Sequence, residues 1–260
     1  MMYFETHGLT APDAPTLVLS SGLGGSAQFW QPQLPALINN YRVIVYDQIG
    51  TGRSPANLPS HYSIAHMADE LLTLLDRLDV SQCHLIGHAL GGLVGLQLAI
   101  RRPDMLSSLL LVNAWSSPNP HTLRCFNIRK AILASGKKDI YLQMQSLLLY
   151  PPDWIAANHA ELSKEEAHHV ANFPNQDNLL ARIHALSTFD IEAQLGDIAT
   201  PTMAIANKDD LLVPWQRSQP FANKMPNAEL VTMEYGGHAS SVTATESFNN
   251  ILLSHLQTFA

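Results

Sequence analysis

The chain has 260 residues, 46% of them hydrophobic, and its 22 Asp and Glu against 15 Lys and Arg give a formal net charge of -7. A chain of this length and composition buries one large core, which excludes a disordered protein, and its acidic balance argues against a nucleic-acid partner. The first ten residues lack the pattern of a signal peptide, and no apolar run reaches the roughly 18 to 20 residues of a membrane span, so we expect a cytoplasmic protein with no membrane partner.

Two early apolar runs, residues 16–21 and 42–47, each lead into a glycine-rich turn. Unbroken apolar runs of this length are typical of strands buried on both faces of a mostly parallel sheet. Residues 64–78 repeat apolar side chains at three- and four-residue spacing and follow Ser63, so they predict a helix with a serine cap.

The next stretch has the pattern of a nucleophile elbow, G-x-S-x-G, except that its serine is missing. A strand run at residues 83–86 enters a turn bounded by Gly87 and Gly91, and a helical run at 93–101 leaves it. This turn is sharp and packs closely, which requires residues without Cβ at both glycine positions. Ala89 therefore stands at the nucleophile position without an attacking oxygen.

Strand and helix alternate up to a strand at residues 107–113, and the alternation then stops. We expect a helical lid at residues 117–190, inserted between two parts of an α/β core, 1–116 and 191–260. The fold class is thus α/β, a mostly parallel central sheet flanked by helices. Within the lid, helices are predicted at 123–134, 140–149, 163–172 and 178–186, the third from a capping box at Ser163.

After the lid the pattern predicts a strand at 202–206, a helix at 215–224, a strand at 229–233 and a final helix at 246–259 that is capped by Thr243.

The ends of the last two strands carry a candidate acid and base. Asp209 and Asp210 follow one of them, and His238 follows the other after two glycines. A carboxylate that holds one imidazole nitrogen fixes the tautomer, so that the other nitrogen can take a proton. We choose Asp210, because the acid of this pattern usually stands four residues before a proline, here Pro214; Asp209 is the alternative.

Two backbone N–H groups, those of Leu23 and Leu90, are expected to form an oxyanion hole. Leu90 directly follows the elbow residue, and Leu23 lies in the loop after the first predicted strand. Backbone donors do not depend on the missing hydroxyl, so stabilisation of negative charge is expected to survive.

The whole chain resembles the α/β-hydrolases and, more narrowly, the RutD-like hydrolases of the Rut pyrimidine-degradation pathway. The resemblance implies a C–N hydrolase that acts late in uracil catabolism, and so in nitrogen metabolism, on carbamate or aminoacrylate. It also implies that alanine is the native residue at the elbow. The stretches that carry it span nearly the full length: residues 21–26, 46–48, 87–91, 121–126, 150–154, 209–214 and 235–239.

Without a side-chain oxygen at Ala89 no ordinary acyl-enzyme can form. We therefore expect His238, held by Asp210, to activate water on a small substrate. Donors for a small anion are expected from the lid. Arg124 is the first choice because it lies in a resembling stretch, and His121, Asn178 and Arg182 are further candidates, although a solvated helix face is an equally good reading of each. Arg129 of the same predicted helix offers another donor.

No cofactor or metal is expected, because the chain lacks G-x-G-x-x-G and a phosphate-loop motif, and because Cys83 and Cys125 show no ligand spacing. Two alternatives stay open: a carboxylesterase or enol-lactone hydrolase whose serine was replaced by alanine, and a non-catalytic ligand-binding protein. The sequence also leaves open a homodimer and the choice between the two substrates.

Overall fold

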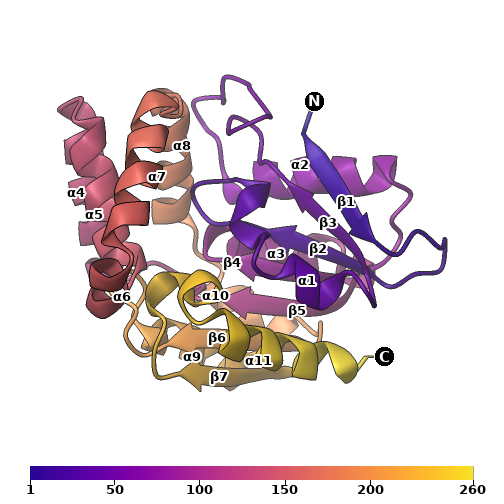
Figure 1. Ribbon diagram of the computed structural model, residues 1–260. Helices are drawn as coiled ribbons and strands as arrows, with labels where there is room; N and C mark the ends of the chain where they lie inside the picture. The colour runs from indigo at the N-terminus through magenta and orange to yellow at the C-terminus, as the bar shows by residue number, and fades with distance from the viewer. Residues whose placement is uncertain (260) are drawn as a thin grey trace.

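Seven strands form one sheet in the order β1-β3-β2-β4-β5-β6-β7 in the computed structural model, which describes residues 1–259 (Figure 1). Only β1 runs antiparallel to its neighbour, so the predicted mostly parallel sheet is confirmed. The strands are β1 (Phe4–Gly8), β2 (Thr16–Ser20), β3 (Arg42–Tyr46), β4 (Cys83–His88), β5 (Leu106–Val112), β6 (Thr202–Asn207) and β7 (Ala228–Met233).

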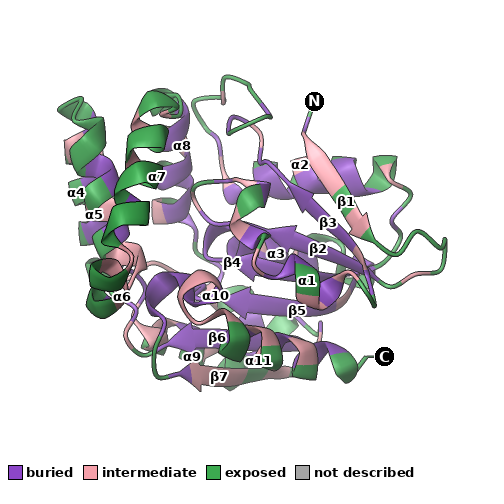
Figure 2. Ribbon diagram, viewed as in Figure 1, coloured by how far each residue is buried: buried purple, intermediate pink, exposed green. Residues whose placement is uncertain are grey.

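The central strands are covered on both faces, which explains their continuous apolar runs. Every residue of β2, β4 and β6 is buried (Figure 2). One face packs against α2 (Ile64–Arg77), α3 (Leu90–Arg101) and α9 (Gln219–Lys224), and the other against α1 (Leu34–Leu37) and α11 (Thr245–Gln257). The predicted cap of α2 is confirmed, since Ser63 Oγ accepts from the backbone N–H of His66.

Five helices follow β5 before the chain returns to the sheet at β6, on the side to which the parallel strands point their carboxyl ends (Figure 1). They are α4 (Pro120–Ala134), α5 (Lys138–Leu149), α6 (Pro152–Ala157), α7 (His159–Ala171) and α8 (Gln176–Thr188). The sequence prediction missed α6, because Pro152 was taken as a break, whereas proline at the first turn of a helix is well tolerated.

Both predicted capping boxes are wrong. Helix α7 begins at His159, so Ser163 lies inside it and donates to the carbonyl oxygen of His159. Thr243 ends the short helix α10 (Ser240–Thr243), and its hydroxyl donates to the carbonyl oxygen of Gly236. In both places the hydroxyl donates to a backbone carbonyl oxygen nearby in sequence and does not cap a helix N-terminus.

The remaining short elements are 3-10 turns: η1 (Ala27–Trp30), η2 (Pro103–Met105), η3 (Glu192–Asp197), η4 (Trp215–Ser218) and η5 (Gly237–Ala239). The helix predicted at 215–224 is therefore η4 followed by α9. Across residues 1–259, no helix is both long enough and apolar enough to cross a membrane.

Candidate active site

The elbow between β4 and α3 keeps its strained geometry although it carries no nucleophile. Ala89 has φ 47° and ψ -111°, an unfavourable conformation for a residue with a Cβ. A Cβ added to Gly91 would lie 2.1 Å from the carbonyl oxygen of Ser20, and one on Gly87 would lie 2.4 Å from that of Gly91. Backbone packing thus requires both glycines, as the sequence predicted, and holds Ala89 at the point of the turn.

His238 and Asp210 form a buried pair beside this edge of the sheet. His238 Nδ1 lies 2.7 Å from Asp210 Oδ2, and their side chains are 2% and 0% exposed. Asp210 Oδ1 accepts from the backbone N–H groups of Leu212 and Val213 at 2.7 and 2.8 Å. These contacts fix the carboxylate, which in turn holds the proton on Nδ1 and leaves Nε2 of His238 for proton exchange.

The alternative acid, Asp209, has a different task. Its two carboxylate oxygens accept from the backbone N–H groups of Gly236 and Gly237 at 3.0 and 2.9 Å. These glycines have φ values of 135° and 63°, so the turn needs residues without Cβ. Asp209 therefore shapes the turn that carries His238.

Two residues that the sequence analysis missed hold the backbone of His238. Its carbonyl oxygen accepts from Asn113 Nδ2 at 2.9 Å and from His88 Nε2 at 2.8 Å. Burial, and then the neighbouring charge of His238, lowers the pKa of His88 to about 3, so this imidazole is neutral. Because a carbonyl only accepts, the proton lies on Nε2, and the buried Nδ1 has no partner within residues 1–259.

The loop that carries one candidate oxyanion donor, Leu23, approaches the elbow that carries the other, since a Cβ on Gly22 would lie 3.7 Å from the Cβ of Ala89. Leu90 begins α3, and Leu23 lies in the loop after β2. Neither backbone N–H donates a hydrogen bond to another part of the described chain. Gln48 Nε2 donates to the carbonyl oxygen of Ser21 at 2.8 Å and steadies this loop.

Of the four predicted anion ligands, only Arg182 lies against this loop with a free donor. Its Nε donates to the carbonyl oxygen of Leu23 at 3.3 Å, and its Nη2 donates to Gln48 Oε1. The side chain is buried, and Nη1 has no partner among the described residues. Burial lowers the pKa of Arg182, whereas Tyr62 and the nearby Glu70 carboxylate raise it, and the guanidinium stays charged.

The structure does not support the other three ligands. Arg124 is exposed on the outer face of α4. His121 Nε2 donates to the carbonyl oxygen of Leu211 at 2.7 Å and so attaches α4 to the loop after Asp210. The Asn178 amide donates to the carbonyl oxygens of Gly50 and Ala56 and accepts from the N–H of Leu58. These bonds attach α8 to the loop at residues 50–58 and leave Asn178 no free donor.

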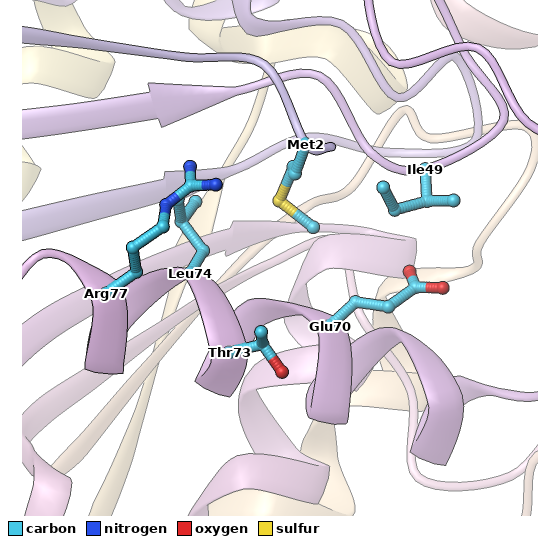
Figure 3. Close-up of a pocket in the computed structure, with 6 residues that line it drawn as sticks. All are labelled: Met2, Ile49, Glu70, Thr73, Leu74 and Arg77. Carbon is cyan, nitrogen blue, oxygen red and sulfur yellow. The ribbon is translucent and has the colours of Figure 1, made fainter.

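Two cavities at the surface lie away from the His238–Asp210 pair, which is called the dyad below. One of about 150 Å³ is lined by side chains from α2 and the N-terminus, including Glu70 and Arg77 (Figure 3). A second lies between α5 and α7. Neither is lined by Ala89, Asp210 or His238.

The dyad is instead covered by the chain between β5 and β6, since a Cβ on Gly237 would lie 2.8 Å from the carbonyl oxygen of Leu149 in α5. Within residues 1–259, no cluster of three His, Cys, Asp or Glu side chains could hold a metal ion.

Comparison with known proteins places the chain in a family. A family model described as the alpha/beta hydrolase fold matches residues 15–143. A protein of Stutzerimonas stutzeri named "Putative carbamate hydrolase RutD" is 62% identical over 98% of this chain and 96% of its own length. A protein of the same name from Agrobacterium fabrum is 44% identical over 98% of both chains.

Solved structures agree on the architecture. A hydrolase from Pseudomonas aeruginosa superimposes with a TM-score of 0.88 at 29% identity, over 98% of this chain and 94% of that one. The enol-lactonase from Burkholderia xenovorans gives a TM-score of 0.89 at 22% identity, over 98% of this chain and 96% of that one, a likeness of fold alone.

Proposed function

The chain belongs to the RutD family of α/β-hydrolases, and on this premise we propose that it promotes hydrolysis of the C–N bond in a small labile acid of pyrimidine (uracil) catabolism, a carbamate or an aminoacrylate. The carbamate comes from the name that the relatives carry. The aminoacrylate comes from the resemblance noted in the sequence. Both hydrolyse spontaneously, so a modest acceleration by positioned groups suffices.

One observation carries the proposal: a complete and buried His238–Asp210 pair remains beside an elbow that has kept its strain but lacks a hydroxyl. In this proposal the strained turn still positions the Leu90 N–H at the start of α3 for developing negative charge. The site is thus suited to a reaction without a covalent intermediate.

For carbamate the steps balance as H₂N–COO⁻ + H₂O → NH₃ + HCO₃⁻. His238 Nε2 takes a proton from water as the water oxygen bonds to the carbon. Negative charge that builds up on the carboxyl oxygen is met by the N–H groups of Leu23 and Leu90. The imidazolium then returns the proton to the departing nitrogen as the C–N bond breaks.

Arg182 is the anion ligand of this proposal. Its guanidinium contacts Leu23 through the carbonyl oxygen and has Nη1 free, so it lies next to one of the two oxyanion donors. A planar two-oxygen anion suits the fork of a guanidinium. The substrate's carboxylate would supply the direct ion pair that no carboxylate in residues 1–259 forms with this guanidinium.

Residues 117–190 serve as a lid in this proposal, inserted between core segments 1–116 and 191–260. His121 and Asn178 attach α4 and α8 to opposite loops of the core. Ala89, Asp210 and His238 are each at most 6% exposed, so a substrate can enter only if some part of this cover moves.

The test is an ammonia-release assay on freshly generated carbamate and on freshly generated aminoacrylate, with the protein, with buffer and with albumin at equal mass. The expected result is release above the spontaneous rate that a serine-directed fluorophosphonate does not inhibit. Release at the buffer rate from both substrates would favour a non-catalytic ligand-binding protein. Inhibition by the fluorophosphonate would favour a serine esterase mechanism.

A further inference from the structure

We propose that Arg129, with Tyr141, forms a second anion-binding site beneath helices α4 and α5, built for a small carboxylate-type anion. This inference deepens the proposed function and rests on it for the source of the anion, which is the carboxylate of the substrate or the bicarbonate product. Both present the same planar pair of oxygens to the donors.

Arg129 points into the protein, unlike Arg124 five residues earlier. The buried residues of α4 recur at helical spacing and place Arg129 on the inner face, where it is 2% exposed. Its Nη2 donates to Gln145 Oε1 at 3.3 Å, and its guanidinium carbon lies 5.6 Å from the centre of the Tyr141 ring.

Both of these partners are neutral. Within the described chain no carboxylate forms an ion pair with Arg129 or with Arg182. A buried charge without a counter-ion destabilises the fold, because its lost hydration is not replaced. Glu70 lies near enough to Arg182 to raise the pKa of its guanidinium, so the argument rests on Arg129, whose buried charge indicates an anion that arrives from outside the chain.

Two polar atoms of the Arg129–Tyr141 pair also lack partners. Arg129 Nε and Tyr141 Oη are both buried without a hydrogen-bond partner in residues 1–259. Arginine Nε can only donate, and burial raises the pKa of Tyr141, which keeps its hydroxyl protonated. An acceptor with two oxygens would satisfy such a set.

Helix α4, which carries Arg129, contacts the loop that follows Asp210 of the dyad. Thr122 Oγ1 donates to the carbonyl oxygen of Leu212, so the first turn of α4 rests on the loop after Asp210. Burial raises the pKa of the Cys125 thiol, which is near enough to both Arg129 and Asp210 to feel their charges. Arg182 contacts the Leu23 loop.

The experiment is calorimetric titration of the full-length protein with sodium acrylate and, separately, with sodium bicarbonate. Wild type is compared with Arg129→Gln, which leaves a shorter polar side chain without the charge, and with Arg124→Gln as the matched exposed control. We expect Arg129→Gln to weaken binding of at least one anion tenfold or more and Arg124→Gln to leave it unchanged. A loss for acrylate assigns the site to the substrate carboxylate, and a loss for bicarbonate assigns it to the product.

Tyr141→Phe removes a single hydroxyl without altering the fold and should weaken the same anion about threefold to tenfold. The anion should also raise the melting temperature of wild type and not that of Arg129→Gln. Wild-type affinity in both Arg129→Gln and Tyr141→Phe would overturn the inference. Binding that depends on Arg129 without any ammonia release would support this site and reject the proposed reaction. Ammonia release together with anion binding that Arg129→Gln does not weaken would support the reaction and reject this site.

Discussion

His88 donates a hydrogen bond from Nε2 to the carbonyl oxygen of His238 at 2.8 Å, so the residue before the missing nucleophile still holds the candidate base. The elbow and the dyad are therefore one mechanical unit, although the covalent step that usually joins them has no side chain to perform it. The contact also satisfies a buried carbonyl oxygen and so stabilises the fold.

The buried neutral state of His88 predicts how stability depends on pH. Its pKa in the folded protein is about 3, below the ordinary value of 6.5, so the unfolded chain binds a proton more readily in this range. Stability should fall as pH drops from about 6.5 towards 3, by up to about 1.4 kcal/mol per pH unit for each such histidine. His255, with a pKa of about 4, adds to the same fall.

Replacing His88 by Gln keeps a donor for the His238 carbonyl and removes the titrating group. Urea unfolding of His88→Gln at pH 7, 6, 5 and 4 should show a smaller loss of stability with falling pH than wild type. The part of this loss that comes from protonation of His255 should remain. Parallel pH curves for the two proteins would contradict the assignment of this proton linkage to His88.

Restoring the hydroxyl should restore nucleophilic chemistry. The strained turn at Ala89, the dyad and the Leu90 donor are already in place, so Ala89→Ser should react covalently with a fluorophosphonate. Intact-protein mass spectrometry should show one added phosphonyl group, and none on wild type. The free energy of unfolding should change by less than about 1 kcal/mol. A folded Ala89→Ser protein that stays unlabelled would show that the elbow is no longer aligned with His238.

Gly91 should tolerate no side chain. An added Cβ would meet the carbonyl oxygen of Ser20, which belongs to the buried strand β2 and cannot move aside. We expect Gly91→Ala to destabilise the fold by about 3 kcal/mol or more, or to prevent folding. Gly24→Ala is the control, since its Cβ would meet nothing within 4 Å, and it should stay within about 0.5 kcal/mol of wild type. Equal melting temperatures for the two variants would contradict the packing argument.

Asn178 is expected to matter for stability and not as a direct ligand. Its amide joins α8 to Gly50, Ala56 and Leu58, and Asn178→Ala would leave buried backbone groups unpaired at a cost of about 1 to 3 kcal/mol. Hydrogen exchange at residues 50–58 should accelerate in this variant. The exposed Asn127→Ala on α4 should leave both stability and exchange unchanged. Unchanged exchange in Asn178→Ala would mean that other contacts hold the loop.

Much of the core could be predicted because its signals are local and strong. The buried strands appear as unbroken apolar runs, and the elbow, Asp210 and His238 each stand at a strand end in a fixed order. Strand β1 was missed because it lies at the edge of the sheet and is only partly buried, so its residues carry no apolar run.

The anion ligands were harder to predict because a donor's type does not reveal what it faces. Arg124 and Arg129 lie on the same helix, but apolar residues such as Ile128 point outward from α4, so its inner face could not be recognised from the pattern. His121 and Asn178 satisfy backbone groups of loops that are distant in sequence. Their contacts depend on tertiary packing, which no local pattern encodes.

The most direct measurement of the central claim is the rate of ammonia release, above the spontaneous rate, for wild type, His238→Gln and Asp210→Asn on the same fresh substrate. Loss of a positioned general base, or of the carboxylate that sets its tautomer, should reduce this excess rate by roughly 100-fold to 10,000-fold. Arg124→Gln, on the outer face of α4, should keep the wild-type rate. If His238→Gln and Asp210→Asn both fold and retain the full excess rate, the dyad does not carry the reaction.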